Sequence, residues 1–374
     1  MADNKNLQKA KKEKNDEFYT LMEDIQNELN HPEYQQVFKG KTIYCNCDDP
    51  EESNFWKYFK LRFKDLELKE LISTHYEKNP EKSSYCLRYD GTNIRREELV
   101  GNGDFRDKEC IELLKQSDIV CSNPPFSLYV EYITQLIEYK KTFIIWGNNN
   151  AISNKDIFPL INRKELFLGY MTNKTCYFQI PDYYEFYDKK YTEKKNDGHK
   201  YAHVQSISIF TNIENSKRNI PLSLEAKFSP EKYYKYINFD AWNIDEVKEI
   251  PKDDYFEIEA SEKEYKSLKD TYQQDCELIS QEKDLYKVKI YRPMLAVPIS
   301  FMSKFSSSQF EIIGSSGQLA KKISTILEKG TYQQGGPSFY SNKITSKDIK
   351  RGFKFHRHYS RIVIRKIKEN NNEN

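Results

Sequence analysis

The stretch SDIVCSNPPFSLYVEYI, residues 117–133, carries the strongest fold signal in this chain. Its apolar run at 119–121 has the pattern of a buried strand, and an amphipathic helical pattern begins after the prolines. Because proline fixes φ at about −65° and has no N–H, the turn that leaves the strand is stiff and its carbonyl groups face outward. We therefore expect a rigid tetrapeptide, Asn123 to Phe126, at the end of a core strand.

The sequence around this stretch alternates between strand and helix patterns. Helical patterns lie at 53–63, 108–115 and 128–139, and strand patterns at 42–45, 71–74, 85–89, 118–122, 142–146, 166–170 and 204–210. Strands separated by helix-length segments indicate βαβ units, so we expect an α/β fold with a mainly parallel central sheet. In such sheets the ligands bind beyond the carboxyl ends of the strands.

The character of the sequence changes after about residue 215. It becomes rich in tyrosine and lysine, and the charged segment 256–291 has the composition of a helical insertion or an exposed arm. Strand patterns return at 296–301, 310–313 and 362–364, which predicts a second, mixed α/β module. The lysine-rich arm 1–14 and the polar tail 369–374 have little to bury and are expected to be mobile and disordered.

Composition argues against several classes of protein. The chain has 374 residues and seven cysteines in no paired framework, so we expect one or two domains with reduced thiols in the cytoplasm. We interpret Cys45 and Cys47 as parts of a packed strand, and we expect no metal site. No apolar run is long enough for a membrane span or a signal peptide.

Net charge by itself does not indicate a polyanionic partner, because 59 basic residues face 57 acidic ones. The distribution of charge is more informative. Residues 350–368 include eight Lys or Arg and no acid, interleaved with aromatic and histidine side chains. Such a run suits contacts with phosphates, and it equally suits the solvated face of a terminal strand.

The tetrapeptide Asn123, Pro124, Pro125 and Phe126 places hydrogen-bond acceptors beside an aromatic ring. The amide oxygen of Asn123 and a carbonyl of the stiff turn suit a substrate that presents an amino group on a flat ring, such as N6 of adenine. Two acceptors that take both hydrogens would draw the nitrogen toward tetrahedral geometry and free its lone pair for attack. Phe126 could then stack on the base.

This strand-end tetrapeptide resembles the signature of amino-group methyltransferases. A longer set of segments resembles the EcoRI-type adenine-specific DNA methyltransferase family over nearly the whole chain. The set comprises NDEFYT (15–20), YCNCDDPEESNF (44–55), STHY (73–76), GNGDF (101–105), SNPPFS (122–127), IFTNIENSKR (209–218), INFDAWNIDEVKEIP (237–251), VPISF and QFEIIG (297–314), and YSRIVIRK (359–366).

The resemblance implies a monomeric enzyme with a Rossmann-like methyltransferase fold. It would transfer a methyl group from S-adenosyl-L-methionine to N6 of a flipped adenine in a short double-stranded DNA target, as a restriction-modification or solitary enzyme. Residues 15–215 would form the catalytic domain and 216–368 the DNA target-recognition region, with the charged insertion 256–291.

The resemblance also implies roles for particular residues. The tetrapeptide 123–126 would be catalytic. The implied cofactor contacts are Phe18, Tyr19, Thr20, Asn46, Asp48, Asp49, Pro50, Ser53, Asn54, Phe55, Thr74, His75, Asp104, Phe105 and Asn123. The candidate DNA contacts are Lys350, Arg351, Lys354, Arg357, His358 and Arg361.

Other functions share parts of this pattern. Enzymes that methylate adenine in structured RNA or glutamine amides in proteins carry the same tetrapeptide, and the basic second region favours DNA over both. A nucleic-acid-binding module with a decayed cofactor site is a further alternative, because segment 44–55 lacks the glycines usual in the family's first motif. The sequence specifies neither the target site nor a cognate restriction endonuclease.

Overall fold

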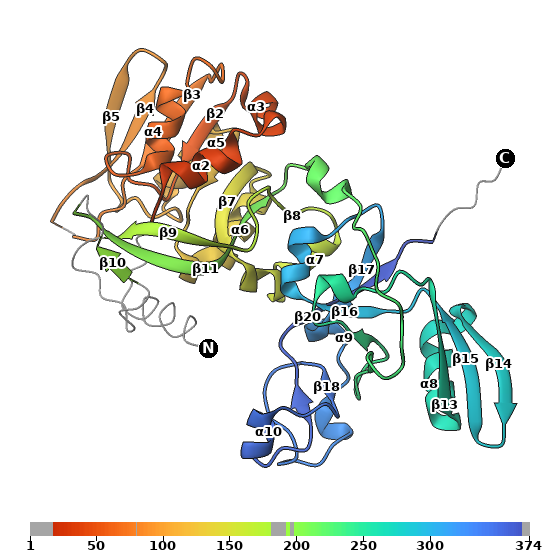
Figure 1. Cartoon of the computed structure of the whole chain (residues 1–374). Coiled ribbons are helices and arrows are strands. Elements are labelled where there is room, and N and C mark those ends of the chain that lie inside the picture. The colour runs from red at the N-terminus through yellow and green to blue at the C-terminus, as the bar shows by residue number, and fades with distance from the viewer. Residues whose placement is uncertain (1–17, 80, 181–191, 195–197, 369–374) are drawn as a thin grey trace, which may run out of the picture. The chain divides into compact units, whose positions relative to one another are not determined.

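A computed structural model describes residues 18–79, 81–180, 192–194 and 198–368 (Figure 1). The predicted arm 1–14 and tail 369–374 lie outside these residues. The chain divides into two compact units, one formed by Met1–Ala151 with Arg163–Asn215, the other by Ile152–Asn162 with Ser216–Asn374. None of the described helices is long and apolar enough to cross a membrane.

The first unit is built on an 11-stranded sheet. Its main path runs in the order β1 (Tyr19–Thr20), β9 (Lys174–Ile180), β11 (Lys200–Thr211), β7 (Thr142–Asn148), β6 (Ile119–Ser122), β2 (Thr42–Cys45), β3 (Glu70–Thr74), β4 (Ser84–Tyr89) and β5 (Ile94–Leu99). The short strands β8 (Phe167–Leu168) and β10 (Thr192–Lys194) pair with β11.

Parallel pairing is confined to the centre of this sheet. The pairs β2–β3, β2–β6 and β6–β7 are parallel, whereas β4 and β5 on one side and β11, β9 and β1 on the other pair antiparallel. The fold is therefore a mixed α/β fold, and the expectation of a mainly parallel sheet was too strong. On the β4–β5 side the connections are short, and a turn such as 90–93 between β4 and β5 permits only antiparallel pairing.

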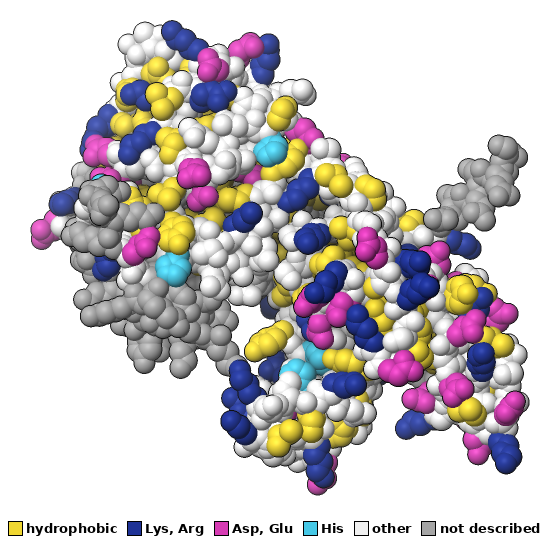
Figure 2. Space-filling model, in the orientation of Figure 1, with side chains coloured by type: hydrophobic (Ala, Val, Ile, Leu, Met, Phe, Trp, Pro, Cys, Tyr) yellow, Lys and Arg dark blue, Asp and Glu magenta, His cyan; other side chains and the backbone are white. Residues whose placement is uncertain are grey.

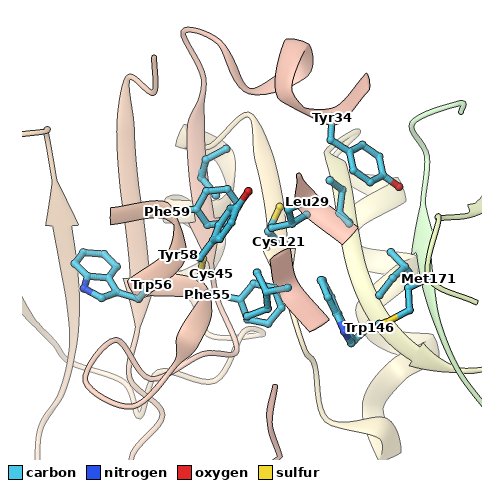
Figure 3. Packing of buried hydrophobic residues seen from close by; sticks show 14 of the residues in the cluster. Leu29, Tyr34, Cys45, Phe55, Trp56, Tyr58, Phe59, Cys121, Trp146 and Met171 are labelled. Carbon is cyan, nitrogen blue, oxygen red and sulfur yellow. The ribbon is translucent and has the colours of Figure 1, made fainter. Parts of the chain in front are cut away.

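Helices α2 (Met22–Leu29), α3 (Pro32–Phe38) and α4 (Asn54–Leu61) share an aromatic core with one face of the sheet. Alternate residues of the central strands point into this core, as the two-residue period of a strand requires. Figure 3 shows Cys45, Cys121 and Trp146 from three strands beside Phe55 and Phe59 of α4. Helices α5 (Lys108–Gln116) and α6 (Tyr129–Glu138) bury other apolar residues.

The second unit contains a four-stranded sheet in the order β12 (Trp242–Asn243), β16 (Leu295–Pro298), β20 (Arg361–Lys366) and β17 (Phe310–Ser315). The unit also includes α7 (Phe158–Asn162) and α9 (Ser316–Leu319). The strand predicted at 296–301 ends at Pro298 and continues as the 3₁₀ helix η7 (Ile299–Lys304), because proline cannot donate to the ladder.

Two smaller sheets complete the second unit. The segment predicted to be a helical insertion or an exposed arm folds instead as β13 (Tyr255–Ser261), α8 (Glu262–Tyr272), β14 (Cys276–Glu282) and β15 (Leu285–Tyr291), with the helix beside a three-stranded antiparallel sheet. A further pair, β18 (Tyr340–Ser341) and β19 (His356–Arg357), flanks α10 (Ser346–Lys350) in sequence.

Candidate active site

The carboxyl ends of β2, β3 and β6 meet at one edge of the sheet. These strands are parallel neighbours, with Cys45 opposite Ser73 and Tyr44 opposite Val120. The residues that follow each strand are therefore brought together although the sequence separates them widely. This edge collects most of the predicted cofactor and catalytic residues.

Asp48 links the end of β2 to the tetrapeptide. The carboxylate is 5% exposed, and it accepts hydrogen bonds from Ser53 Oγ at 3.0 Å, Ser122 Oγ at 2.5 Å and the Asn123 backbone N–H at 3.3 Å. Burial raises the pKa of Asp48 to about 6, and these donors oppose that rise. Asp48 therefore ties the end of β2 to the residue before α4 and to the start of the tetrapeptide.

Asn123 is positioned by its own amide group. Its Nδ2 donates a hydrogen bond to the backbone oxygen of Phe18 at 2.7 Å, so that Oδ1, on the opposite side of the amide, is directed away from this oxygen. Oδ1 is buried and has no hydrogen-bond partner among the described residues. Because a buried polar atom without a partner is costly, this oxygen is a candidate to receive a hydrogen from a ligand.

The backbone carbonyls of the two prolines differ in their hydrogen bonding. The carbonyl of Pro125 accepts from the Leu128 N–H at 3.0 Å, where the 3₁₀ helix η1 (Phe126–Leu128) begins. The carbonyl of Pro124 accepts no hydrogen bond from any residue that the structure describes. The turn thus leaves one side-chain acceptor and one backbone acceptor without a partner among the described residues.

Phe126 lies in an aromatic cluster that joins distant segments. Its ring centroid is 5.6 Å from that of Phe18 and 6.2 Å from that of Phe178 on β9. The rings of Phe18 and Phe178 are 5.7 Å apart. Phe126 is only partly buried, so part of its ring is accessible for stacking. Phe178 was not predicted, because its apolar strand pattern is that of any core residue.

The segment that contains Tyr19 and Thr20 forms β1 at the far end of the sheet path, paired with β9. Asn54 fixes it, because Asn54 Nδ2 donates to the backbone oxygen of Thr20 at 2.8 Å. The Thr20 hydroxyl is buried and has no partner among the described residues. It is a second buried polar atom that a ligand could satisfy.

Asn46 and Thr74 lie deep at the same edge. The Asn46 side-chain oxygen accepts from the Tyr132 hydroxyl, and the Thr74 hydroxyl donates to the Asn46 backbone oxygen at 3.2 Å. Neither Tyr132 nor Ser122 was predicted to belong to the site. Tyr132 lies on the buried stripe of α6, where sequence does not distinguish a site residue from a core residue.

His75 pairs with Asp49 across the ends of β3 and β2. Their Nδ1 and Oδ2 atoms are 2.7 Å apart, and the imidazole is stacked on Tyr85 with ring centroids 4.9 Å apart. Glu77 lies on the other side of the ring, 3.5 Å from Nε2. The hydrogen bond to Asp49 raises the pKa of His75, whereas burial opposes the rise. Burial alone would raise the pKa of Asp49, but its hydrogen bonds lower it overall.

These shifts predict a pH dependence. A raised His75 pKa means that the ion pair stabilises the folded protein fully below the ordinary histidine value of 6.5, and that this stabilisation is lost as the pH rises through the pKa of the folded protein. We expect NMR titration to place the His75 pKa above 6.5 and Asp49→Asn to lower it. An unchanged His75 pKa in Asp49→Asn would contradict the pairing.

Asp104 and Phe105 follow the glycine-containing turn before α5. Asp104 is held by Arg106, whose Nη2 is 2.7 Å from Oδ2 and whose Nε is 2.8 Å from Oδ1. Burial raises the pKa of Asp104, but the hydrogen bonds from Arg106 outweigh it, so that the pKa is lowered and the carboxylate stays charged. The Phe105 ring meets Tyr132 edge-on at 5.0 Å.

Gly103 packs directly against the segment that contains His75. Its φ is +81°, and a Cβ there would lie 2.0 Å from the His75 backbone oxygen. Only glycine fits this close approach without strain. The turn at 101–105 is thereby held beside the end of β3, as its predicted place in the cofactor site requires.

Four predicted cofactor residues lie in the turn before α4 or at the start of the helix, namely Pro50, Ser53, Asn54 and Phe55. Ser53 caps the helix, because its Oγ accepts from the Phe55 N–H at 3.0 Å, and Pro50 is buried in the preceding turn. The Phe55 side chain is fully buried, edge-on to Trp146 at 4.8 Å. Phe55 therefore packs the helix onto the core and presents no side-chain surface to a ligand.

The six candidate DNA contacts differ in exposure. Lys350, Arg351 and Lys354 are exposed. His358 is buried and 2.8 Å from Ser341 Oγ, and burial lowers its pKa to about 3. Arg361 is buried and donates to Asp245 at 2.8 Å. Since these two side chains are engaged inside the unit, we exclude them from the proposed DNA contacts.

A matched pair of substitutions checks this division. Arg361→Ala removes a buried guanidinium and its packing and is expected to lower the free energy of unfolding by about 1–3 kcal/mol. Lys354→Ala should change the free energy of unfolding by less than about 0.5 kcal/mol. It should, however, reduce the slope of log affinity for DNA against log salt concentration by about one. Urea unfolding and DNA affinity at several salt concentrations measure both effects, and the reverse pattern would contradict the assignment.

Comparison with known proteins places the chain in a family. The family described as adenine-specific methyltransferase EcoRI matches residues 6–260. The Type II methyltransferase M.EcoRI of Escherichia coli is 37% identical over 83% of this chain and 89% of its own length. The Type II methyltransferase M.MpnI of Mycoplasma pneumoniae is 41% identical over 66% of this chain and 76% of its own length. No solved structure matches the chain significantly.

Proposed function

The chain belongs to the family of EcoRI-type adenine-specific methyltransferases, and from this premise we propose how its residues methylate adenine N6 in duplex DNA. It is a DNA adenine methyltransferase whose relatives are Type II enzymes of restriction-modification. Both relatives are named Type II methyltransferases. No observation favours an RNA or protein substrate. We also propose that the fold is Rossmann-like, which the parallel pairing of β3, β2, β6 and β7 supports.

The strand-end edge has the chemistry that S-adenosyl-L-methionine requires. The cofactor carries a positive charge, ribose hydroxyls and an adenine ring. Asp49 and Asp104 offer carboxylates, both with a lowered pKa, and the Thr20 hydroxyl is buried without a partner among the described residues. We propose that these residues, with Phe18 and Phe105 as apolar walls, bind the cofactor.

When bound, the cofactor supplies a methyl group already activated on a sulfonium, so the protein needs to provide orientation rather than a covalent nucleophile. Asn123 Oδ1 and the Pro124 carbonyl accept the two hydrogens of N6. These bonds direct the nitrogen lone pair out of the ring plane. Rigid prolines and the bond from Asn123 to Phe18 would keep both acceptors still while the methyl group moves from sulfur to N6, and one of the two N6 hydrogens would then leave as a proton to water.

The target base must leave the duplex to reach this edge. Extrusion costs a few kcal/mol, which contacts with the flipped base and with the DNA backbone offset. The partly exposed ring of Phe126 offers a stacking surface, supported from behind by Phe18 and Phe178. The aromatic cluster is thus proposed to hold the base against the acceptors.

The observation that carries this proposal is the buried Asn123 oxygen without a partner among the described residues. Its test is methyl transfer by the purified chain from tritiated cofactor to duplex DNA, followed by nucleoside analysis. N6-methyladenine is the expected product. Label in cytosine, in RNA or in protein, with none in adenine of DNA, would contradict the proposal.

A further inference from the structure

Residues 316–360 of the second unit form a segment that we call the basic module, and its charge is unusually one-sided. It contains nine Lys or Arg residues and only two acids. The charged segment 256–291, in contrast, contains nine acids and six Lys or Arg residues. The positive charge of this unit is therefore concentrated in the basic module.

All cations of the basic module except Arg357 are exposed, and among the described residues the exposed ones form no salt bridge. Asp348, one of the two acids, is buried. Its carboxylate accepts a hydrogen bond from the Thr345 hydroxyl and lies 2.7 Å from His356 Nδ1, so it interacts with groups inside the module. Figure 2 shows lysine and arginine side chains spread over the lobe that contains α10 and β18 in Figure 1. Exposed, unpaired cations suit the phosphates of a duplex.

An exposed loop at 333–337, with the sequence QQGGP, projects from the basic module. Both of its ends are anchored. The Tyr340 hydroxyl donates to the Gln333 backbone oxygen at 2.9 Å, and Asn238 Nδ2 donates to the Ser338 backbone oxygen at 2.9 Å. Tyr332, directly before the loop, is buried. The loop is thus exposed at its tip and fixed at its base.

Arg357 on β19 supports the tip of this loop. Its Nε donates to Ser338 Oγ at 3.0 Å and its Nη2 to the Gly336 backbone oxygen at 3.3 Å. A Cβ on Gly335 would lie 2.2 Å from Arg357 Nη1, so the guanidinium approaches the backbone at a place where a larger residue would displace it. Arg357 is therefore engaged within the protein as a support for the loop.

Gln334 lies in the part of the loop that precedes Gly335 and Gly336. It is exposed, and its amide forms no hydrogen bond with the residues that the structure describes. A glutamine amide carries a donor and an acceptor at the spacing that matches N7 and N6 of adenine in the major groove. The residues that follow it in the loop, Gly335, Gly336 and Pro337, are exposed as well.

We propose that loop 333–337 reads a base of the DNA target, with Gln334 as the residue that contacts an adenine edge and Arg357 as the residue that positions the loop. The exposed cations of the basic module bind the flanking phosphates. This inference rests on the proposed function, because it requires a double-stranded DNA substrate.

Sequencing of N6-methyladenine in a host without adenine methylation tests the inference. Wild type is expected to methylate one motif. Gln334→Ala should still methylate but discriminate less at one base of that motif, by roughly 10-fold or more. The matched control is Gln274→Ala, which changes an exposed glutamine in the charged segment 256–291 and should keep the wild-type motif. An unchanged motif in Gln334→Ala would overturn the inference.

Arg357→Lys separates support of the loop from a phosphate contact. It keeps the positive charge but loses the bonds to Ser338 and Gly336, so a supporting role predicts the same relaxed base as in Gln334→Ala with an unchanged melting temperature. The wild-type motif in Arg357→Lys would overturn that role. If wild type itself methylates no adenine, the proposed function fails, whereas an active enzyme with an unaltered motif in Gln334→Ala refutes this inference alone.

Discussion

Asn123→Ala is expected to lower the rate of methyl transfer by at least about 10³-fold, because it removes a fixed acceptor of the transition state. The substitution deletes the buried Oδ1 and also the bond that ties the turn to Phe18. DNA affinity should change little, since the proposed phosphate contacts lie in the other unit. Single-turnover kinetics with tritiated cofactor and a filter-binding assay measure the two quantities separately.

The matched control for Asn123→Ala is Asn162→Ala, which removes an exposed asparagine outside the site and should leave turnover unchanged. A loss of turnover together with a loss of the folded state would be detected by circular dichroism. Near wild-type turnover in folded Asn123→Ala would refute the assignment of this residue.

Asp48→Ala is expected to have the largest effect on stability. It leaves the Ser53 and Ser122 hydroxyls and the Asn123 backbone N–H without their acceptor in a buried place. We expect a loss of about 2–4 kcal/mol in the free energy of unfolding. Urea unfolding measures it, and calorimetry with the cofactor should show weakened binding.

The loss in Asp48→Ala should also depend on pH. Because burial raises the pKa of Asp48 from 3.8 to about 6, the folded protein binds this proton more tightly than the unfolded chain does. The stability that Asp48 contributes therefore falls as the pH rises through this range. We expect a larger difference between wild type and variant below pH 6 than above it. If the difference in the free energy of unfolding between wild type and Asp48→Ala grew with pH, burial would not raise the pKa of Asp48.

Much of the site could be predicted because its residues follow strands. The strand before Asn123 was predicted at 118–122 and runs over Ile119–Ser122, and the one before Asp48 was predicted at 42–45 and runs over Thr42–Cys45. Short apolar runs with turn residues after them give a clear local signal. Parallel pairing of the strands then brings their carboxyl ends together. The sequence of one segment alone does not predict this neighbourhood.

The remainder depends on tertiary contacts. Ser122, Tyr132 and Phe178 have the patterns of ordinary strand or helix residues, and only the fold turns them toward Asp48, Asn46 and Phe126. The basic run at 350–368 was misleading in part for the same reason. Residues 361–364 enter the four-stranded sheet and His358 packs beside His356 of β19, so that Arg361 and His358 are buried although both side chains are polar.

The central claim is that Asn123 orients adenine N6 for methylation in DNA. Its most direct test is single-molecule sequencing of plasmid DNA from a host without adenine methylation that expresses wild type or Asn123→Ala at equal levels. The account predicts N6-methyladenine at one recurring motif with wild type and none above background with Asn123→Ala. Equal methylation by both proteins, or none by wild type, would contradict it.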